Sequence, residues 1–107
     1  MIEKTETSYW VKIYSSGSIE VAKQAIRQEC QRTGLCVTIE PTTFIYTGGE
    51  EDGFVVGLIN YPRFPASDET IWNRAVCIAR DILEATFQDS TLIMSPDKTL
   101  WITKRGA

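Results

Sequence analysis

The chain has 107 residues, of which 43% are hydrophobic and 23% charged, and its formal net charge is −3. This composition predicts one soluble globular domain over residues 1–107, with residues 1–8 as a candidate disordered tail. The 14 acidic residues outnumber the 11 basic ones, which does not favour direct nucleic-acid binding. No apolar run approaches the roughly 18 residues of a membrane span. No signal peptide is recognisable, so we expect a cytoplasmic location and no membrane partner.

Histidine is absent, and this excludes several kinds of catalytic site. Neither a Ser-His-Asp triad nor a Cys-His pair can form, and the usual histidine-ligated zinc sites are also excluded. The three cysteines, Cys30, Cys36 and Cys77, form no C-x-x-C pair. We therefore expect no disulfide framework, no metal and no cofactor, and we expect Cys30 and Cys77 to be small buried side chains.

The predicted elements alternate between strand and helix. In chain order they are a strand at 9–14, a helix at 18–33, strands at 35–40, 43–47 and 54–61, a helix at 67–87, and strands at 91–94 and 99–103. Ser18 and Ser67 are expected to cap the two helices, and Gly34 to end the first. Pro41 indicates a break, a bulge or an edge position. The acidic run 50–52, between glycines, is expected in a hairpin turn.

This order of elements predicts an α+β fold. A single antiparallel or mixed sheet with both helices on one face satisfies it. The arrangement is that of the ferredoxin-like split β-α-β fold with one added C-terminal strand. That fold serves many functions, so it does not by itself identify one.

Two segments are candidate ligand-binding sites. In the first, Tyr46 offers a flat ring, and Thr47, Gly48 and Gly49 offer backbone donors; the alternative is an ordinary hairpin turn. In the second, prolines hold Arg63 in a stiff connection beside Tyr61, where Arg63 can pair with phosphate or carboxylate. The alternative there is a packed connection whose arginine pairs with a surface acid.

Trp72 and Trp101 are candidate interface residues. Trp72 directly follows Ile71, and Trp101 lies on the opposite strand face from Leu100 and Ile102. At least one of these rings is therefore expected on a second, partly exposed apolar surface. Such a surface is typical of a protein interface and indicates a homo-oligomer.

Three segments resemble a family of small accessory proteins of T-even-type tailed phages: residues 9–14 (YWVKIY), 44–65 and 95–101 (SPDKTLW). The resemblance covers nearly the whole chain. It implies expression in an infected bacterial cytoplasm and a role in host takeover or counter-defence. The family has no established catalytic or binding residues that could be carried over.

We therefore expect a non-enzymatic phage protein that binds a nucleotide-like small anion or a host protein. A second hypothesis is a protein–protein inhibitor or assembly factor with no small ligand. A third is a small histidine-free enzyme that turns over a nucleotide or a small acid. In that enzyme, substitution of Glu50, Glu51 or Asp52 would abolish activity.

Overall fold

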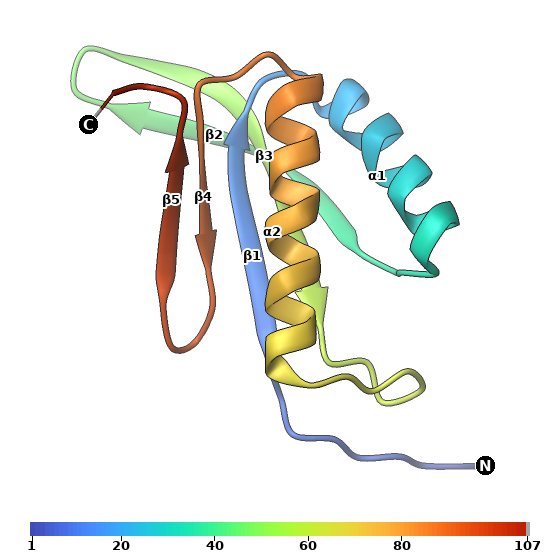
Figure 1. Cartoon of the computed structure of the whole chain (residues 1–107). Helices are drawn as coiled ribbons and strands as arrows, with labels where there is room; N and C mark the ends of the chain where they lie inside the picture. Colours follow the sequence, from blue (N-terminus) through green and yellow to red (C-terminus); the bar gives the residue numbers. More distant parts are fainter. Residues whose placement is uncertain (107) are drawn as a thin grey trace.

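The chain forms one antiparallel sheet of five strands in the order β2-β3-β1-β4-β5 (Figure 1). The computed structural model describes residues 1–106. Its elements are β1 (Trp10–Ser16), α1 (Ile19–Thr33), β2 (Thr38–Tyr46), β3 (Gly49–Ile59), α2 (Asp68–Ala85), β4 (Ser90–Met94) and β5 (Thr99–Thr103). The order β2-β3-β1-β4 is that of the split β-α-β fold, and β5 is the added strand at the edge. The predicted fold class is confirmed.

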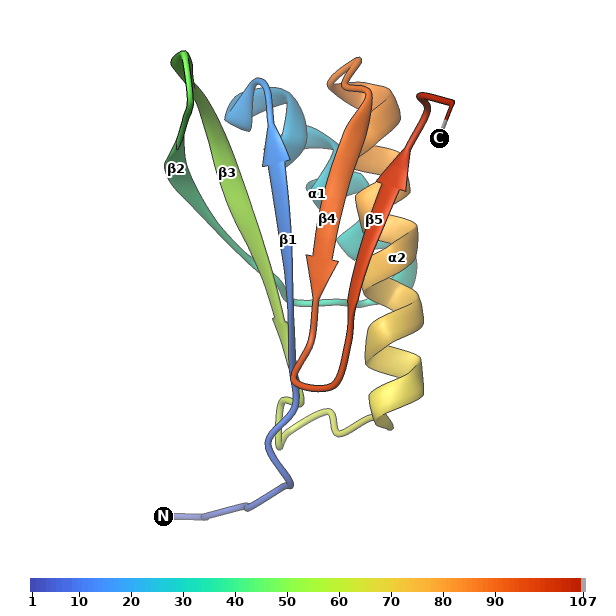
Figure 2. The ribbon, with the colours of Figure 1, turned by 90° about the vertical axis from the view of Figure 1, so that its left-hand side faces the viewer.

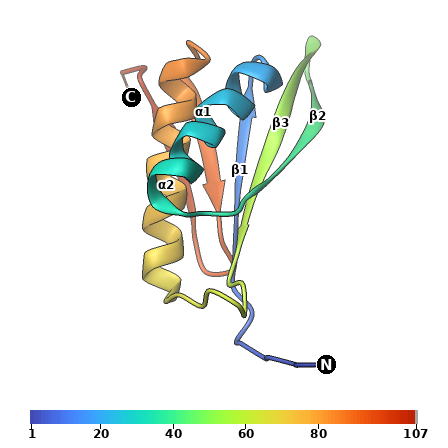
Figure 3. The same ribbon diagram turned by 90° about the vertical axis from the view of Figure 1, so that its right-hand side faces the viewer.

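Both helices cover the same face of the sheet, as the view from the helix side shows (Figure 3). The other face is open, and the far end of the β2–β3 hairpin bends out on that side (Figures 1 and 2). Among residues 1–106, no helix is long and apolar enough to cross a lipid bilayer.

The core lies between the sheet and the helices and follows the alternation of the strands. Val11 and Ile13 on β1 and Phe54 and Val56 on β3 point towards the helices and are fully buried. The buried side of α2 is formed by Ile71, Ala75, Ile78, Ala79, Ile82 and Leu83. Because successive side chains of a strand point to opposite faces, the residues that alternate with these four lie on the open face.

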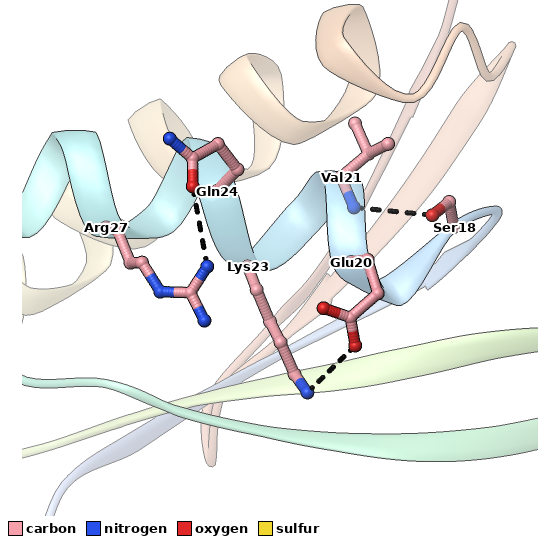
Figure 4. Close-up of polar contacts among 6 residues, drawn as sticks. All are labelled: Ser18, Glu20, Val21, Lys23, Gln24 and Arg27. Carbon is pink, nitrogen blue, oxygen red and sulfur yellow. Dashed lines mark hydrogen bonds and ion pairs between the residues drawn. The ribbon is translucent and has the colours of Figure 1, made fainter.

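Local hydrogen bonds begin and end α1 at the predicted residues. The Ser18 hydroxyl oxygen accepts a hydrogen bond from the Val21 N–H at 3.3 Å (Figure 4). At the other end Gly34 adopts a left-handed φ of 70°, and its N–H donates to the Cys30 carbonyl. Ser67 caps α2 in the same way by accepting from the Thr70 N–H at 3.1 Å. Both predicted caps and the predicted glycine end are confirmed.

Pro41 does not interrupt its strand. β2 runs continuously through it, and Pro41 lies opposite Phe54 in the register. Because β2 is an edge strand, the N–H that proline lacks is not needed by a second neighbour. Of the three interpretations open for Pro41, the edge position is correct.

The acidic run lies in a strand, and its prediction as part of a turn is wrong. Tyr46 pairs with Gly49, so only Thr47 and Gly48 form the turn. Gly48 takes a φ of 93°, which favours glycine. Residues 50–52 continue β3, and their side chains therefore alternate between its two faces. Thr47 and Gly48 suffice for a two-residue hairpin turn, which leaves the acids to pair with β2.

The burial of the cysteines differs from the prediction. Cys30, Cys36 and Cys77 are all free thiols. Cys30 packs against the core, and its partial burial raises the pKa of its thiol. Cys77 is exposed, so its predicted burial is wrong: its position on α2 falls outside the stripe that faces the sheet.

Gly53 is required because three strands meet closely around it. A Cβ at Gly53 would overlap the Ser15 carbonyl oxygen and the Phe44 ring. We expect Gly53→Ala to lower the free energy of unfolding by about 1–3 kcal/mol, measured by urea denaturation, since the strands must separate. Gly106→Ala is the control, because a Cβ there meets nothing within 4 Å. Equal unfolding midpoints for the two variants would contradict the expectation.

Asp81 on α2 lies near Glu29 of α1, whose carboxylate accepts from the Arg32 guanidinium at 2.7 Å. Partial burial, and next the negative charge of Glu29, raise the pKa of Asp81 above its ordinary value. A raised pKa means that the folded chain holds this proton more tightly, so the stabilising contribution is present at low pH. It is lost as the pH rises through the folded pKa.

We therefore expect Asp81→Asn to be more stable than the natural chain at pH 7 and equally stable near pH 3. The gain stays below about 1 kcal/mol, because the side chain is largely exposed and solvent screens it. Urea denaturation at both pH values measures it. Glu6→Gln, in the exposed N-terminal segment, is the control. A destabilised Asp81→Asn at pH 7 would show that the charge is favourable.

Candidate functional site

A hollow of about 450 Å³ opens on the uncovered face of the sheet. The bent end of the β2–β3 hairpin and the neighbouring parts of β1, β4 and β5 contribute its lining residues. Figure 2 shows how these strands are arranged. Its lining residues are Tyr14, Ser15, Ser16, Phe44, Ile45, Tyr46, Glu51, Ser90, Thr91, Leu92, Met94 and Trp101. All five strands contribute to it, so this set of residues exists only in the folded sheet.

The register of the sheet brings these side chains together. Phe44 lies opposite Glu51, and Leu92 lies opposite Trp101. Cross-strand partners point to the same face, so Phe44 lies beside Glu51 and Trp101 lies beside Leu92. Because Gly53 has no side chain, the Phe44 ring can lie across it.

Glu51 is the one charged residue among those that line the hollow. Its carboxylate accepts a hydrogen bond from the Ser16 hydroxyl at 2.8 Å. This bond joins β1 to β3 and orients the carboxylate beside the aromatic rings. No basic side chain lines the hollow.

Buried hydroxyl groups anchor the floor of the hollow. The Ser15 and Thr91 hydroxyls share a hydrogen bond, and the Thr91 hydroxyl also lies 3.1 Å from the Tyr14 carbonyl oxygen, to which it can donate. Both residues are buried, at 2% and 3% exposure. The bonds join β1 to β4 at the level of the hollow, so the strand ends that carry Tyr14 and Ser16 are held in place.

This arrangement suits a flat ligand that carries a positive charge. Aromatic faces attract cations and stack on planar rings, and a carboxylate adds direct charge attraction. The hollow holds Tyr14, Phe44, Tyr46 and Trp101 around a single carboxylate. It differs from the predicted anionic ligand, which would need a basic group in the same place.

The candidate ligand residues lie in two places. Tyr46 lines the hollow, whereas Thr47, Gly48 and Gly49 form or follow the turn beside it. Tyr61 and Arg63 follow the far end of β3 and line a separate cleft. A single chain therefore does not bring Tyr46 and Arg63 to one small ligand, because the 11 residues of β3 separate their positions.

The two tryptophans proposed for an interface also lie in different parts of the molecule. Trp101 is 57% exposed on the open face of β5. Trp72 is half-buried on α2, packs against the core, and lies under the Lys98 ammonium, 4.5 Å from the ring centroid. The two rings do not share one surface, and an interface role for either remains a prediction.

Sequence reasoning missed most of the hollow. The predicted first strand ends at residue 14, before Ser16, and the sequence indicates no ligand role for Leu92 or Met94. A usable signal was present in the first strand, where Trp10, Lys12 and Tyr14 share the face that does not enter the core. The sequence could not show that residues 30 to 87 positions beyond Tyr14, from Phe44 to Trp101, would add their own side chains to that face.

The acidic run does not form a cation site. Alternation along β3 places Glu51 on the open face and Glu50 and Asp52 on the other. Within residues 1–106, no group of three potential metal-ligating side chains converges.

No protein-family model matches the chain, and no curated protein matches it. Solved structures do match it over nearly its whole length. A phage SAM lyase in its apo state covers 100% of this chain and 98% of its own, with a TM-score of 0.73 and 15% identity. A phage SAM lyase in complex with S-methyl-5′-thioadenosine covers 96% and 95%, with a TM-score of 0.76 and 14% identity.

At such low identity the likeness establishes a shared fold. The expectation of a non-enzymatic protein is corrected on this point, because it conflicts with matches that are structures of a lyase, which is an enzyme. The lyase structures are phage proteins, which agrees with the phage origin that the resemblance implies but does not identify the T-even accessory family. The ligand of the second structure is a small nucleoside, the broad ligand class expected from the sequence.

Proposed function

We propose that this chain is a lyase that cleaves S-adenosylmethionine and releases methylthioadenosine in the hollow of the open face. The observation that carries the proposal is Glu51, a single oriented carboxylate in an otherwise uncharged hollow that is lined by four aromatic rings. The end-to-end fold likeness to a phage SAM lyase supports it.

The chemistry of the substrate fits the lining residues. S-adenosylmethionine carries a positive sulfonium centre and a flat adenine ring. The rings of Tyr14, Phe44, Tyr46 and Trp101 attract a cation and stack on a base. Each cation–π contact contributes roughly 0.5–2 kcal/mol, depending on how well water is excluded. Glu51 holds the sulfonium by direct charge attraction.

Cleavage breaks the bond between the sulfonium sulfur and Cγ of the amino-acid arm. The bonding electron pair moves to sulfur, which becomes neutral, so methylthioadenosine leaves without needing a proton. Since a lyase adds no water, the four-carbon fragment has two balanced outcomes. It loses a proton from Cβ and becomes an alkene, or its own carboxylate bonds to Cγ and closes a lactone.

These two outcomes assign different roles to Glu51. In the elimination, Glu51 is the general base that accepts the Cβ proton. In the ring closure, it binds and orients the sulfonium while the substrate carboxylate is the nucleophile. An apolar hollow favours both routes, because positive charge on sulfur disappears as the bond breaks. Proton NMR of the products distinguishes an alkene from a lactone.

The central test is Glu51→Gln, which keeps the size of the side chain and removes its charge. We expect the natural chain to convert S-adenosylmethionine into methylthioadenosine. We expect kcat/KM to fall about 100-fold or more in Glu51→Gln, the usual scale for loss of a catalytic acid or base. Liquid chromatography of methylthioadenosine measures the rate.

Glu50→Gln is the matched control, because Glu50 is adjacent, exposed and directed to the other face of β3. It should retain the activity of the natural chain, and both variants should unfold at the same temperature. An inactive natural chain, or equal losses in both variants, would overturn the proposal.

The open face also supports the prediction of a homo-oligomer. Ile59, Tyr46 and Trp101 on this face are 58%, 54% and 57% exposed. We infer that copies of the chain pack through this face and exclude water from the hollow.

Native mass spectrometry should detect an oligomer that Trp101→Lys dissociates. Phe87→Lys, at a 90% exposed ring that follows α2, should leave it intact. A monomeric natural chain would contradict this inference.

A further inference from the structure

A second cleft, of about 150 Å³, lies at the other end of β3, where the chain leaves the sheet for α2. Tyr61, Arg63 and Phe64 line it from the connection, and Arg74 lines it from α2. Neither Asp nor Glu is among its lining residues. It shares no residue with the hollow around Glu51.

The two arginines of the cleft are not used in ion pairs. Within residues 1–106, the acidic partners of basic side chains are Glu20, Glu29, Glu84 and Asp89, and none of them pairs with Arg63 or Arg74. The cleft is therefore lined by two positive charges that form no ion pair with a carboxylate of residues 1–106. Each guanidinium group presents a planar fork of N–H donors, which matches the oxygens of a phosphate.

Aromatic rings form the wall beside these charges. The Tyr61 and Phe64 ring centroids lie 6.2 Å apart at an interplanar angle of 38°. The Arg63 guanidinium lies 5.3 Å from the Phe64 centroid, which holds it against the ring. Tyr61 and Phe64 are 45% and 65% exposed, so both have surface available to a flat ligand.

Hydrogen bonds hold the connection in one conformation. The Asn60 side chain donates to the Thr7 carbonyl at 2.9 Å and accepts from the Ala66 N–H at 3.1 Å. The Phe64 N–H donates to the Tyr61 carbonyl at 2.9 Å. Prolines before and after residues 63–64 restrict the backbone further. A ligand would therefore meet a preformed site and would not have to order a loop.

We propose that this cleft is a second binding site, for a small phosphate monoester that carries a flat ring, the chemical class of a nucleoside monophosphate. The phosphate lies between Arg63 and Arg74, and the ring lies against Tyr61 and Phe64. Two uncompensated positive charges match a dianionic phosphate better than the cationic substrate of the Glu51 hollow. The two sites thus select ligands of opposite charge.

Isothermal titration with adenosine monophosphate tests the site, in the presence of saturating methylthioadenosine to occupy the Glu51 hollow. We expect one site per chain. Adenosine and inorganic phosphate should each bind at least about tenfold more weakly than adenosine monophosphate, because each supplies half of the contacts. Arg63→Ala and Arg74→Ala should each raise Kd about tenfold or more.

Arg80→Ala is the matched control, because Arg80 is exposed on the same helix as Arg74 and does not line the cleft. Its Kd should equal that of the natural chain, and thermal unfolding should show that all three variants remain folded. Absence of binding by the natural chain would overturn the proposal. Binding of adenosine as tightly as adenosine monophosphate would also overturn it. A loss of affinity in Arg80→Ala as large as in Arg63→Ala and Arg74→Ala would overturn it too, because it would indicate general charge attraction. Glu51→Gln should still bind adenosine monophosphate, which separates this test from that of the lyase.

Discussion

The antiparallel register between β1 and β3 is the constraint on which the rest of the structure depends. It places Ile13 opposite Val56 on the side that the helices cover, and Tyr14 opposite Val55 on the open side. A slip of one residue would move every apolar core side chain to the wrong face. Gly53 fits this register without a clash, because only a hydrogen atom can occupy the space beside the Ser15 carbonyl.

The same register creates the hollow. It places Ser16 opposite Gly53. Glu51 precedes Gly53 by two positions, so it lies on the same face, and its carboxylate accepts a hydrogen bond from the Ser16 hydroxyl. The carboxylate is thus positioned by paired backbone rather than by a mobile loop. A short, oriented hydrogen bond on rigid strands is the kind of support that a catalytic group needs.

Charge is distributed along β3 in a way that the net charge of −3 does not show. At one end Glu51 is the one carboxylate that lines the hollow with the aromatic rings, and at the other Arg63 and Arg74 line a cleft with Tyr61 and Phe64 and without an acid. Both places combine rings with charge, but the signs are opposite. In the sequence these two places resemble one anionic ligand site, because Tyr46 and Arg63 are only 17 positions apart in the chain.

The sequence by itself determined the elements whose causes are local. Ser18, Ser67 and Gly34 satisfy the free backbone groups at helix ends, and period-two alternation separated the two faces of β1. The sequence-based prediction was wrong for residues 50–52, where pairing with β2 extended the strand. It was also wrong for Cys77, whose exposure depends on how α2 packs. Only the tertiary structure decided the sites. The hollow draws residues from all five strands, and such long-range pairing leaves no mark in the spacing of any one segment.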